Sequence, residues 1–500
     1  MSIELQNEHD YEIKNNLENT NSYLNIFKKI YGYFEDWLDR QEKKIMLKKL
    51  MEDCNTYEEW SNYAKELDIV ERKESWKKKK ESSQYDYKEL EKLIKVLQKK
   101  KEMKDISGLV HYIRSNLVKN LYSTLNPRLY QVCHHGTKYL IEDFNEEMLK
   151  SLDFISNYNE KIFPLHKKLE FFSETRHSYG RTSLLLSGGA SLGIYHIGVI
   201  KTLYKQNLLP RIICGSSAGS IVASIVCTTP YEKVIDDIER DFKNGGPFQY
   251  KDKKNSIFFK ILKYITSGVL YDVEVLSECL REEIGDVTFQ EAFDRTGWIL
   301  NITVTGYKEH ANHRLLNYLT APNVLIWSAS CASSCVPGLF DPTELMCKNE
   351  YGHIVPYSSN RVKFIDGSLS ADLPMQRLSE LFNVNIFIVS QTNPWVIPFL
   401  EQEDHKEVFQ AEKTFNLWKL IKTLIFSEIK HRFIQIQTLG ILPKFITKWF
   451  NIITQDYKGH VTIFPVPKIV DYFKIFDNPN KESIVYATIH ASRRTFPSKI

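Results

Sequence analysis

Residues 211–219 read RIICGSSAG, which places a Gly-x-Ser-x-Gly motif directly after a short apolar stretch. We expect a buried strand over residues 211–214, a tight turn, and then a helix of small and apolar residues. A sharp strand-to-helix turn exposes the hydroxyl of its central serine, and flanking glycines are needed because a β-carbon would collide with the neighbouring strand or helix. The motif therefore predicts that Ser217 is a nucleophile between the glycines Gly215 and Gly219. In isolation, the same motif also fits a turn with a purely structural role.

A second glycine-rich loop lies one strand-helix-strand unit upstream. Residues 187–193 read SGGASLG, after a candidate strand over 182–186 and before a helix expected from about residue 192 to 206. Such a loop can turn backbone N–H groups toward a developing oxyanion, although on its own it also fits a nucleotide phosphate. The 29 positions from Gly188 to Ser217 favour the first interpretation. Adjacent parallel strands would bring both loops to the same carboxyl edge of a sheet.

A serine nucleophile needs a base, and the sequence offers one carboxylate at the end of a strand. Asp366-Gly367 follows a candidate strand over residues 361–365, although Asp-Gly is also a hairpin signal. An aspartate that acts directly on serine is a weak base unless it is partly desolvated. The histidines after Asp366 stand in no context that indicates a base, and they are His405, His431, His460 and His490.

The chain divides into three parts by composition. Residues 1–175 are helical and charged in pattern, residues 180–395 alternate strands with helices, and residues 396–500 are amphipathic and helical. Further strands are expected over 298–305 and 384–390. Strands that alternate with helices predict an α/β fold with a mainly parallel sheet and helices on its faces.

The two flanking regions carry amphipathic and basic segments. The basic runs Lys77–Lys80 and Lys99–Lys101 fit a solvated helix face, and they also fit contact with anionic lipid headgroups. Residues 411–453 place apolar and aromatic side chains at helical spacing, with lysines between them. This stretch fits a lipid interface and equally fits a helix packed on the catalytic module.

Composition limits the classes of protein that need to be considered. The 66 basic and 62 acidic side chains give a net charge of +4, so nucleic acid is not a favoured partner. The 8 cysteines are scattered and the start of the chain lacks a secretory leader, which favours a reducing compartment. No apolar stretch reaches the ~20 residues of a membrane span, so we expect a protein that is soluble or lies on a surface.

Two cysteine-containing motifs could suggest metal binding. Cys133-His134-His135 has adjacent side chains that cannot all converge on one ion, so we favour structural burial there and expect no metal. Cys331 and Cys335 lie one helical turn apart among small residues, where core packing is the simpler interpretation.

Taken together, the motifs at 187–193, 215–219 and 366–367 resemble those of patatin-like phospholipases, and the resemblance is closer still to the branch of fungal and plant triacylglycerol lipases. It extends from about residue 45 to the C-terminus. The further stretches that carry it are 209–213, 316–320, 337–340, 372–374, 380–385 and 430–432.

The resemblance implies a patatin-like three-layer α/β/α fold with helical extensions, and a Ser–Asp dyad without histidine. Ser217 and Asp366 would be catalytic, and the oxyanion hole would be formed by Gly188, Gly189, Ala190 and Gly193. Ala190 stands where many members have a third glycine, a mild departure because its amide remains. No histidine is followed by the acyltransferase spacing of four residues and an aspartate. The family also implies lipid droplets or a membrane surface, on the cytosolic side, and no cofactor.

Four functions fit these observations. The first is hydrolysis of triacylglycerol or a related glycerolipid through an acyl-enzyme, and the second is phospholipid or lysophospholipid hydrolysis by the same residues. The third is a conventional Ser-Asp-His hydrolase with His431 or His460 as base. The fourth is a lipid-surface scaffold without activity. Oligomeric state is not indicated by the sequence.

Overall fold

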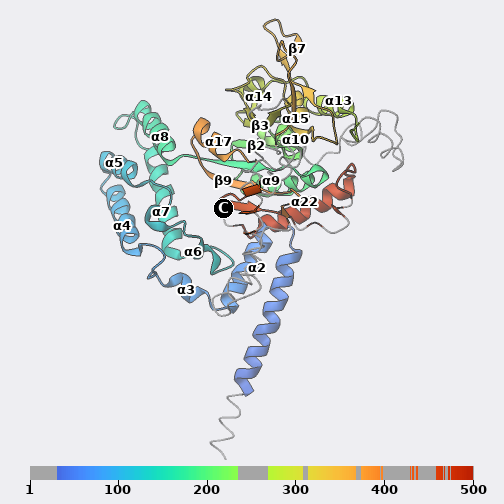
Figure 1. Ribbon diagram of the computed structural model, residues 1–500. Helices are drawn as coiled ribbons and strands as arrows, with labels where there is room; N and C mark the ends of the chain where they lie inside the picture. The colour runs from blue at the N-terminus through green and yellow to red at the C-terminus, as the bar shows by residue number, and fades with distance from the viewer. Residues whose placement is uncertain are drawn as a thin grey trace, which may run out of the picture.

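Figure 1 presents a computed structural model of the chain, in which an arm of helices lies beside a sheet-containing body. The structure describes residues 31–234, 268–307, 313–367, 373–394, 396–397, 458–465, 471–472 and 474–498, with isolated positions at 428, 431–432, 435–436 and 467.

The N-terminal part is helical, as expected. A helix over residues 31–53 projects from the body, and it is drawn as the long blue helix in Figure 1. The helices that follow are α2 (Tyr57–Val70), α3 (Glu74–Lys78), α4 (Tyr87–Glu102), α5 (Ile106–Asn116), α6 (Pro127–Gln131), α7 (Tyr139–Ser156) and α8 (Leu165–Tyr179). Apolar side chains at helical spacing, such as Leu90, Leu93 and Leu97 of α4, form a core of their own within this arm.

The central sheet is mixed but mainly parallel where the site lies. Its order is β10-β9-β1-β2-β3-β8-β5, with β4 also paired to β3. Neighbours among β10, β9, β1, β2 and β3 are parallel, whereas β4 and β8 run antiparallel to β3, and β5 runs antiparallel to β8. The strands are β1 (Arg181–Leu186), β2 (Ile212–Gly215), β3 (Ile299–Gly306), β4 (His313–Leu316), β5 (Thr343–Glu344), β8 (Lys363–Asp366), β9 (Val384–Ser390) and β10 (Val461–Ile463). A separate small hairpin joins β6 (Met346–Lys348) and β7 (Ile354–Pro356).

The strand β3 brings the ends of β2 and β8 together. Ile302 pairs with Gly215 of β2 and with a residue of β4, so β2 and β4 lie on opposite edges of β3. Val304 pairs with Asp366 of β8 and again with β4, so β8 lies on the same edge as β2. Because β8 runs opposite to β2, their carboxyl ends meet head-on, with only Thr303 between the two paired positions on β3.

Helices cover both faces of the sheet and make three layers. One face packs against α9 (Tyr195–Lys205), α10 (Ala218–Thr228), α13 (Val273–Ile284) and α15 (Ile326–Ser334), through inward residues such as Leu184 and Ile213. The alternate residues, such as Leu185 and Ile212, pack against α17 (Met375–Phe382). The helix α14 (Phe289–Thr296) precedes β3.

The C-terminal helix α22 (Lys481–Thr495) joins the two parts of the molecule. It lies against α9, where a β-carbon on Gly198 would be 2.2 Å from the carbonyl oxygen of Thr488. Arg493 donates to the carbonyl oxygens of Cys54 and Asp53 at 3.0 and 2.8 Å, and Phe496 packs with Trp60 of α2. The helix α22 and Phe496 therefore hold α2 and the end of the helix over residues 31–53 against the sheet-containing body (Figure 1).

The predicted fold class is confirmed, with local corrections. The helix expected from about residue 192 begins instead as the 3-10 turn η2 (Ala190–Ile194) and continues as α9. The amphipathic stretch 411–453 lies outside the described residues except at five positions. Among the described residues, no helix is long and apolar enough to cross a membrane.

Candidate active site

The Gly-x-Ser-x-Gly motif forms a sharp turn between β2 and α10. Ser217 has φ 51° and ψ −127°, a backbone conformation that side-chain-bearing residues rarely adopt. The turn is held by its neighbours: the amide of Ser216 donates to the carbonyl oxygen of Leu186 at 3.1 Å, and the amide of Ser220 donates to that of Ser217 at 2.8 Å. Ser217 is 8% exposed. This strained turn between strand and helix is the geometry that the sequence predicted.

Gly215 and Gly219, the two glycines of this nucleophile elbow, are required because a β-carbon would not fit at either position. A β-carbon on Gly215 would lie 2.4 Å from the carbonyl oxygen of Gly219, and one on Gly219 would lie 2.2 Å from that of Leu186. These neighbours are backbone atoms, which cannot swing away as a flexible side chain could. Glycine at both positions therefore lets α10 start directly against the end of β1.

The glycine loop after β1 lies beside the elbow. The strands β1 and β2 are parallel neighbours, with Leu186 paired to Gly215, so the two loops leave the same sheet edge. A β-carbon on Gly193 would be 2.6 Å from that of Ala218, the first residue of α10. The structure thus brings residues 188–193 next to Ser217, as the spacing predicted.

Ala190 occupies a position that favours glycine. Its φ is 49°, in the left-handed region that costs a residue with a β-carbon about 1–2 kcal/mol. A glycine would adopt the same conformation without that cost. The alanine therefore keeps the amide in place at the expense of local backbone strain.

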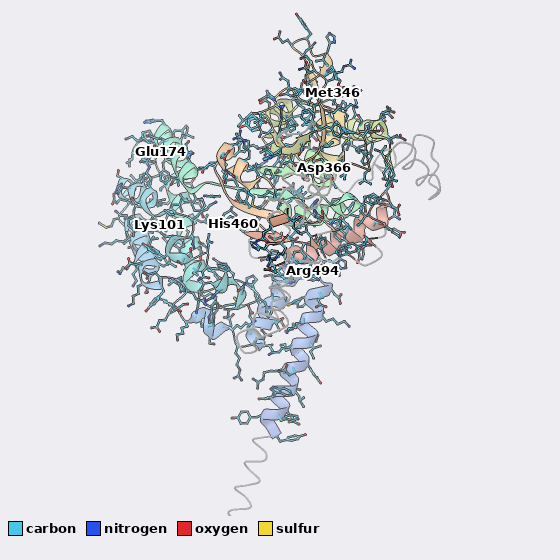
Figure 2. The ribbon with its side chains drawn as sticks, viewed as in Figure 1. Lys101, Glu174, Met346, Asp366, His460 and Arg494 are labelled. Carbon is cyan, nitrogen blue, oxygen red and sulfur yellow. The ribbon has the colours of Figure 1, made fainter. Side chains whose placement is uncertain are left out.

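Asp366 is fully buried at the end of β8, and one segment links it to Ser217. The hydroxyl of Ser333, at the end of α15, accepts the amide N–H of Ser217 at 3.0 Å. Two residues later, the carbonyl oxygen of Cys335 accepts the amide N–H of Asp366 at 3.0 Å. Ser333, Cys335 and Asp366 are each 0% exposed. Figure 2 shows Asp366 within the sheet-containing body. The backbones of the sequence-predicted nucleophile and carboxylate therefore both hydrogen-bond to one short segment.

The thiol of Cys335 stays protonated beside this carboxylate. Its pKa is raised well above the usual value by the hydrogen bond with Cys331, by burial, and by the negative charge of Asp366. The thiol is directed to the carbonyl oxygen of Cys331 at 3.1 Å. Cys331 and Cys335 are therefore packing residues, in agreement with the interpretation of their spacing. The contact of Cys335 with Asp366 did not follow from that spacing.

The structure describes contacts for three of the four histidines that follow Asp366. His460 precedes β10, three strands from β2 in the sheet order, and its Nδ1 accepts the amide N–H of Phe387 at 3.2 Å. His490 lies on α22 against the ring of Tyr486. His431 hydrogen-bonds to Gln435 at 3.0 Å, and His405 lies outside the described residues. These contacts do not support His460 or His490 as the base.

A segment far along the chain covers the glycine loop and was not foreseen. The amide of Ser191 donates to the carbonyl oxygen of Ile475 at 3.0 Å, and its hydroxyl donates to that of Lys474 at 3.1 Å. The hydroxyl of Tyr271 donates to the carbonyl oxygen of Phe476 at 2.9 Å. Residues 474–476 therefore form a strap over this loop, which a local sequence pattern could not reveal.

The cysteine-histidine motif at 133–135 has a structural role. The amides of His134 and His135 donate to the two carboxylate oxygens of buried Asp68 at 2.8 and 3.0 Å, and Cys133 contacts the carbonyl oxygen of Gly136 at 3.0 Å. In the part of the chain that the structure describes, no group of three or more His, Cys, Asp or Glu side chains could hold a metal ion.

Comparison with known proteins agrees with this architecture. A family model described as Patatin-like phospholipase matches residues 184–378, and one described as Domain of unknown function (DUF3336) matches residues 37–177. The first match spans the glycine loop, the elbow and Asp366.

Three curated relatives match nearly the whole chain. It is 37% identical over 460 residues to Triacylglycerol lipase SDP1L of Arabidopsis thaliana, covering 90% of this chain and 55% of that protein. It is 36% identical over 472 residues to Triacylglycerol lipase 4 of Saccharomyces cerevisiae, covering 91% and 51%. It is 35% identical over 459 residues to Triacylglycerol lipase ptl3 of Schizosaccharomyces pombe, covering 91% and 93%. The chain thus spans about half the length of the first two relatives.

The relationship to the Schizosaccharomyces pombe protein extends over almost all of both chains, and the catalytic-domain match falls on the sheet that carries the strained serine. On this basis, the chain belongs to the patatin-like phospholipase family.

Proposed function

We propose that the protein is a serine lipid acyl hydrolase that cleaves glycerolipid esters, with Ser217 as nucleophile and Asp366 as general base. The Oγ of Ser217 attacks the ester carbonyl carbon while its proton passes to the carboxylate of Asp366. The amides of the loop with Gly188, Gly189 and Ala190 hold the tetrahedral oxyanion. Collapse expels the glyceride alkoxide, which takes the proton from Asp366. Water then attacks the acyl-enzyme carbonyl and gives a proton to Asp366. Collapse releases the fatty acid and the Oγ of Ser217, which takes that proton back from Asp366 and restores the enzyme.

One observation carries this proposal: the segment from Ser333 to Cys335 contacts the backbone of both proposed catalytic residues. Its contacts with Ser217 and Asp366 are each 3.0 Å long. The head-on approach of β2 and β8 along one edge of β3 supports the same pairing. Because Asp366 is removed from water, its carboxylate is a stronger base toward a neighbouring hydroxyl than an exposed one would be.

We propose triacylglycerol as the substrate class. Three relatives that match about 90% of the chain are named triacylglycerol lipases. Phospholipid is the second candidate, because the matching family model is described as a phospholipase and the same residues would serve. The N-terminal helical region, the catalytic region at 180–395 and the C-terminal region would then be separate parts of one lipase.

A lipid droplet or membrane surface, on its cytosolic side, is the proposed location. The helix over residues 31–53 exposes aromatic side chains, with Tyr33 at 72%, Phe34 at 54% and Trp37 at 51%. Aromatic rings of this kind are favoured where apolar and aqueous phases meet. The helix projects from the body, which leaves these rings free to enter a lipid phase (Figure 1).

The test is fatty-acid release from trioleoylglycerol and from phosphatidylcholine, each presented as an emulsion or vesicle to the whole chain. Wild type is expected to release fatty acid faster from trioleoylglycerol, and Ser217→Ala is expected to release none from either lipid. Faster release from phosphatidylcholine would favour the second candidate. Equal rates for wild type and Ser217→Ala would refute the proposed function. His460→Asn is the matched control and should keep wild-type activity, since His460 has no place in the proposed dyad.

A further inference from the structure

A buried histidine lies next to the glycine loop. His196 is the second residue of α9 and is 0% exposed. Its Nδ1 is 2.7 Å from the hydroxyl of Ser390, and its Nε2 is 3.0 Å from the carbonyl oxygen of Ser187. The hydroxyl of Thr392 is also 3.1 Å from Nε2. Both nitrogens of the ring are thus engaged by residues at the ends of β1 and β9.

The chemistry of these partners fixes the tautomer. A carbonyl oxygen can only accept, so Nε2 must carry the hydrogen that it donates to Ser187. Nδ1 is then the acceptor for the hydroxyl of Ser390. Burial lowers the pKa of His196 to about 4, against a smaller opposite effect of the hydrogen bond with Ser187. The ring is therefore neutral near pH 7, with one donor and one acceptor.

The atoms that His196 holds lead directly into the glycine loop. Ser187 precedes Gly188, and its hydroxyl accepts the amide N–H of Thr392 at 2.8 Å. Gly189 lies close against Thr392, because a β-carbon on Gly189 would be 2.5 Å from the hydroxyl oxygen of that residue. The imidazole ring therefore cross-links the start of the loop to the 390–392 segment on which the loop rests.

We propose that His196 is a positioning residue that sets the direction of the loop amides by holding Ser187 and Thr392 in register. It touches no substrate and acts only through residues 187–189. The inference rests on the proposed role of this loop in binding the oxyanion. A displacement of about 1 Å in such a group can lower the rate about 100-fold. Contacts that bind the substrate away from this loop would be unaffected. Loss of His196 should therefore lower kcat and leave KM unchanged.

Three substitutions at one position test the inference with a soluble ester, p-nitrophenyl butyrate. His196→Phe removes both hydrogen bonds and should lower kcat about 100-fold, with KM changed less than about threefold. His196→Gln can place an amide N–H near the Nε2 position, so it should recover kcat by about tenfold over the Phe variant. His196→Asn places its amide near the Nδ1 position and should not recover it.

Thr202→Val is the matched control, because Thr202 is a buried residue of the same helix whose hydroxyl donates to the carbonyl oxygen of Gly198 at 2.9 Å. It should keep the wild-type kcat. The inference is overturned if His196→Phe keeps more than about a third of the wild-type kcat. It is also overturned if the kcat of His196→Gln does not exceed that of both His196→Asn and His196→Phe. If His196→Phe does not fold, Thr392→Val decides: an unchanged kcat overturns the inference, and a loss of about tenfold supports it.

These outcomes are separate from those of the proposed function. If wild-type hydrolysis of the ester is unaffected by Ser217→Ala, the proposed function itself fails. If the hydrolysis requires Ser217 but is insensitive to position 196, only the role of His196 fails.

Discussion

Polar groups are buried in two regions of this molecule, and the two regions hold them differently. In the N-terminal arm, buried polarity includes charges paired with charges. Asp68 lies 2.9 Å from the ammonium group of Lys77, and Glu71 lies 2.6 Å from that of Lys73 and 3.1 Å from His134. These pairs join α2, α3 and the loop at 133–137, so they connect segments that the apolar core alone would leave apart.

At the carboxyl edge of the sheet, the buried partners are mainly hydroxyls, amides and a neutral imidazole. Ser187, His196, Ser390 and Thr392 hold one another, and Ser333 holds the backbone of Ser217. The difference teaches that the arm holds buried charges by pairing them. At the sheet edge, neutral groups hold the backbone around Asp366, the carboxylate that we propose as the base.

The largest expected effect is on activity, at the sheet edge. Asp366→Asn keeps the shape of the side chain but removes the base, so kcat should fall roughly 10²- to 10⁴-fold. The melting temperature should change little, because the amide of Asp366 keeps its bond to Cys335. Ester hydrolysis and thermal unfolding, measured on the same preparation, check this. A variant that stays active would remove Asp366 from the mechanism.

The corresponding change in the arm should act on stability and not on chemistry. Asp68→Asn leaves the buried ammonium group of Lys77, 4% exposed, without its main counter-charge, which typically costs about 3–5 kcal/mol. Denaturant unfolding should report this loss, while kcat per folded molecule stays at the wild-type value. A large fall in kcat with normal stability would contradict the contrast between the two regions.

The two regions should also respond to acid over different pH ranges. Burial lowers the pKa of His196 to about 4, so between pH 6.5 and 4 the unfolded chain binds a proton that the folded chain does not. Stability should therefore fall by about 3 kcal/mol as the pH drops through this range. His196→Phe should remove this component, and an unchanged pH slope in the variant would refute the assignment.

In the arm, Glu71 should make stability depend on pH over a lower range than His196 does. Burial acts to raise its pKa, but hydrogen bonds from His134 and Lys73 outweigh burial and lower it to about 2. The stability that it contributes is present above its unfolded value near 4.5 and is lost as the pH falls toward 2. Acid unfolding of Glu71→Gln below pH 4.5 should separate this contribution from that of His196.

The smallest effect is expected at an exposed ion pair of the arm. Glu174 lies 2.5 Å from Arg114, with the two side chains 53% and 41% exposed, and Figure 2 labels it at the outer part of the arm. Glu174→Gln should change the free energy of unfolding by less than about 0.5 kcal/mol. A loss comparable to that of Asp68→Asn, measured by the same denaturant titration, would mean that exposure does not separate the two kinds of ion pair.

The sequence was sufficient to predict those parts of the candidate site that depend on local geometry. The elbow glycines follow from collisions within a few residues of Ser217, and the spacing of the two loops follows from one strand-helix-strand unit. The antiparallel direction of β8 was not predicted, because a strand pattern carries no information about its partner. The three-part division of the chain stays a prediction.

The contacts that were missed join residues far apart along the chain. His196 lay within a helix pattern that looked apolar, and its partners Ser390 and Thr392 are nearly 200 positions away. Ser333 lay in a run of small residues that indicated only packing. A polar residue on a buried helix face just after a glycine loop is the one local signal that could have pointed to His196.

The most direct test of the central claim is to map the residue that a fluorophosphonate modifies in the whole protein, by mass spectrometry. The account predicts one adduct, on the hydroxyl of Ser217, which is absent in Ser217→Ala and unaffected by His460→Asn. An adduct on any other residue, or no adduct in wild type that hydrolyses esters, would contradict it.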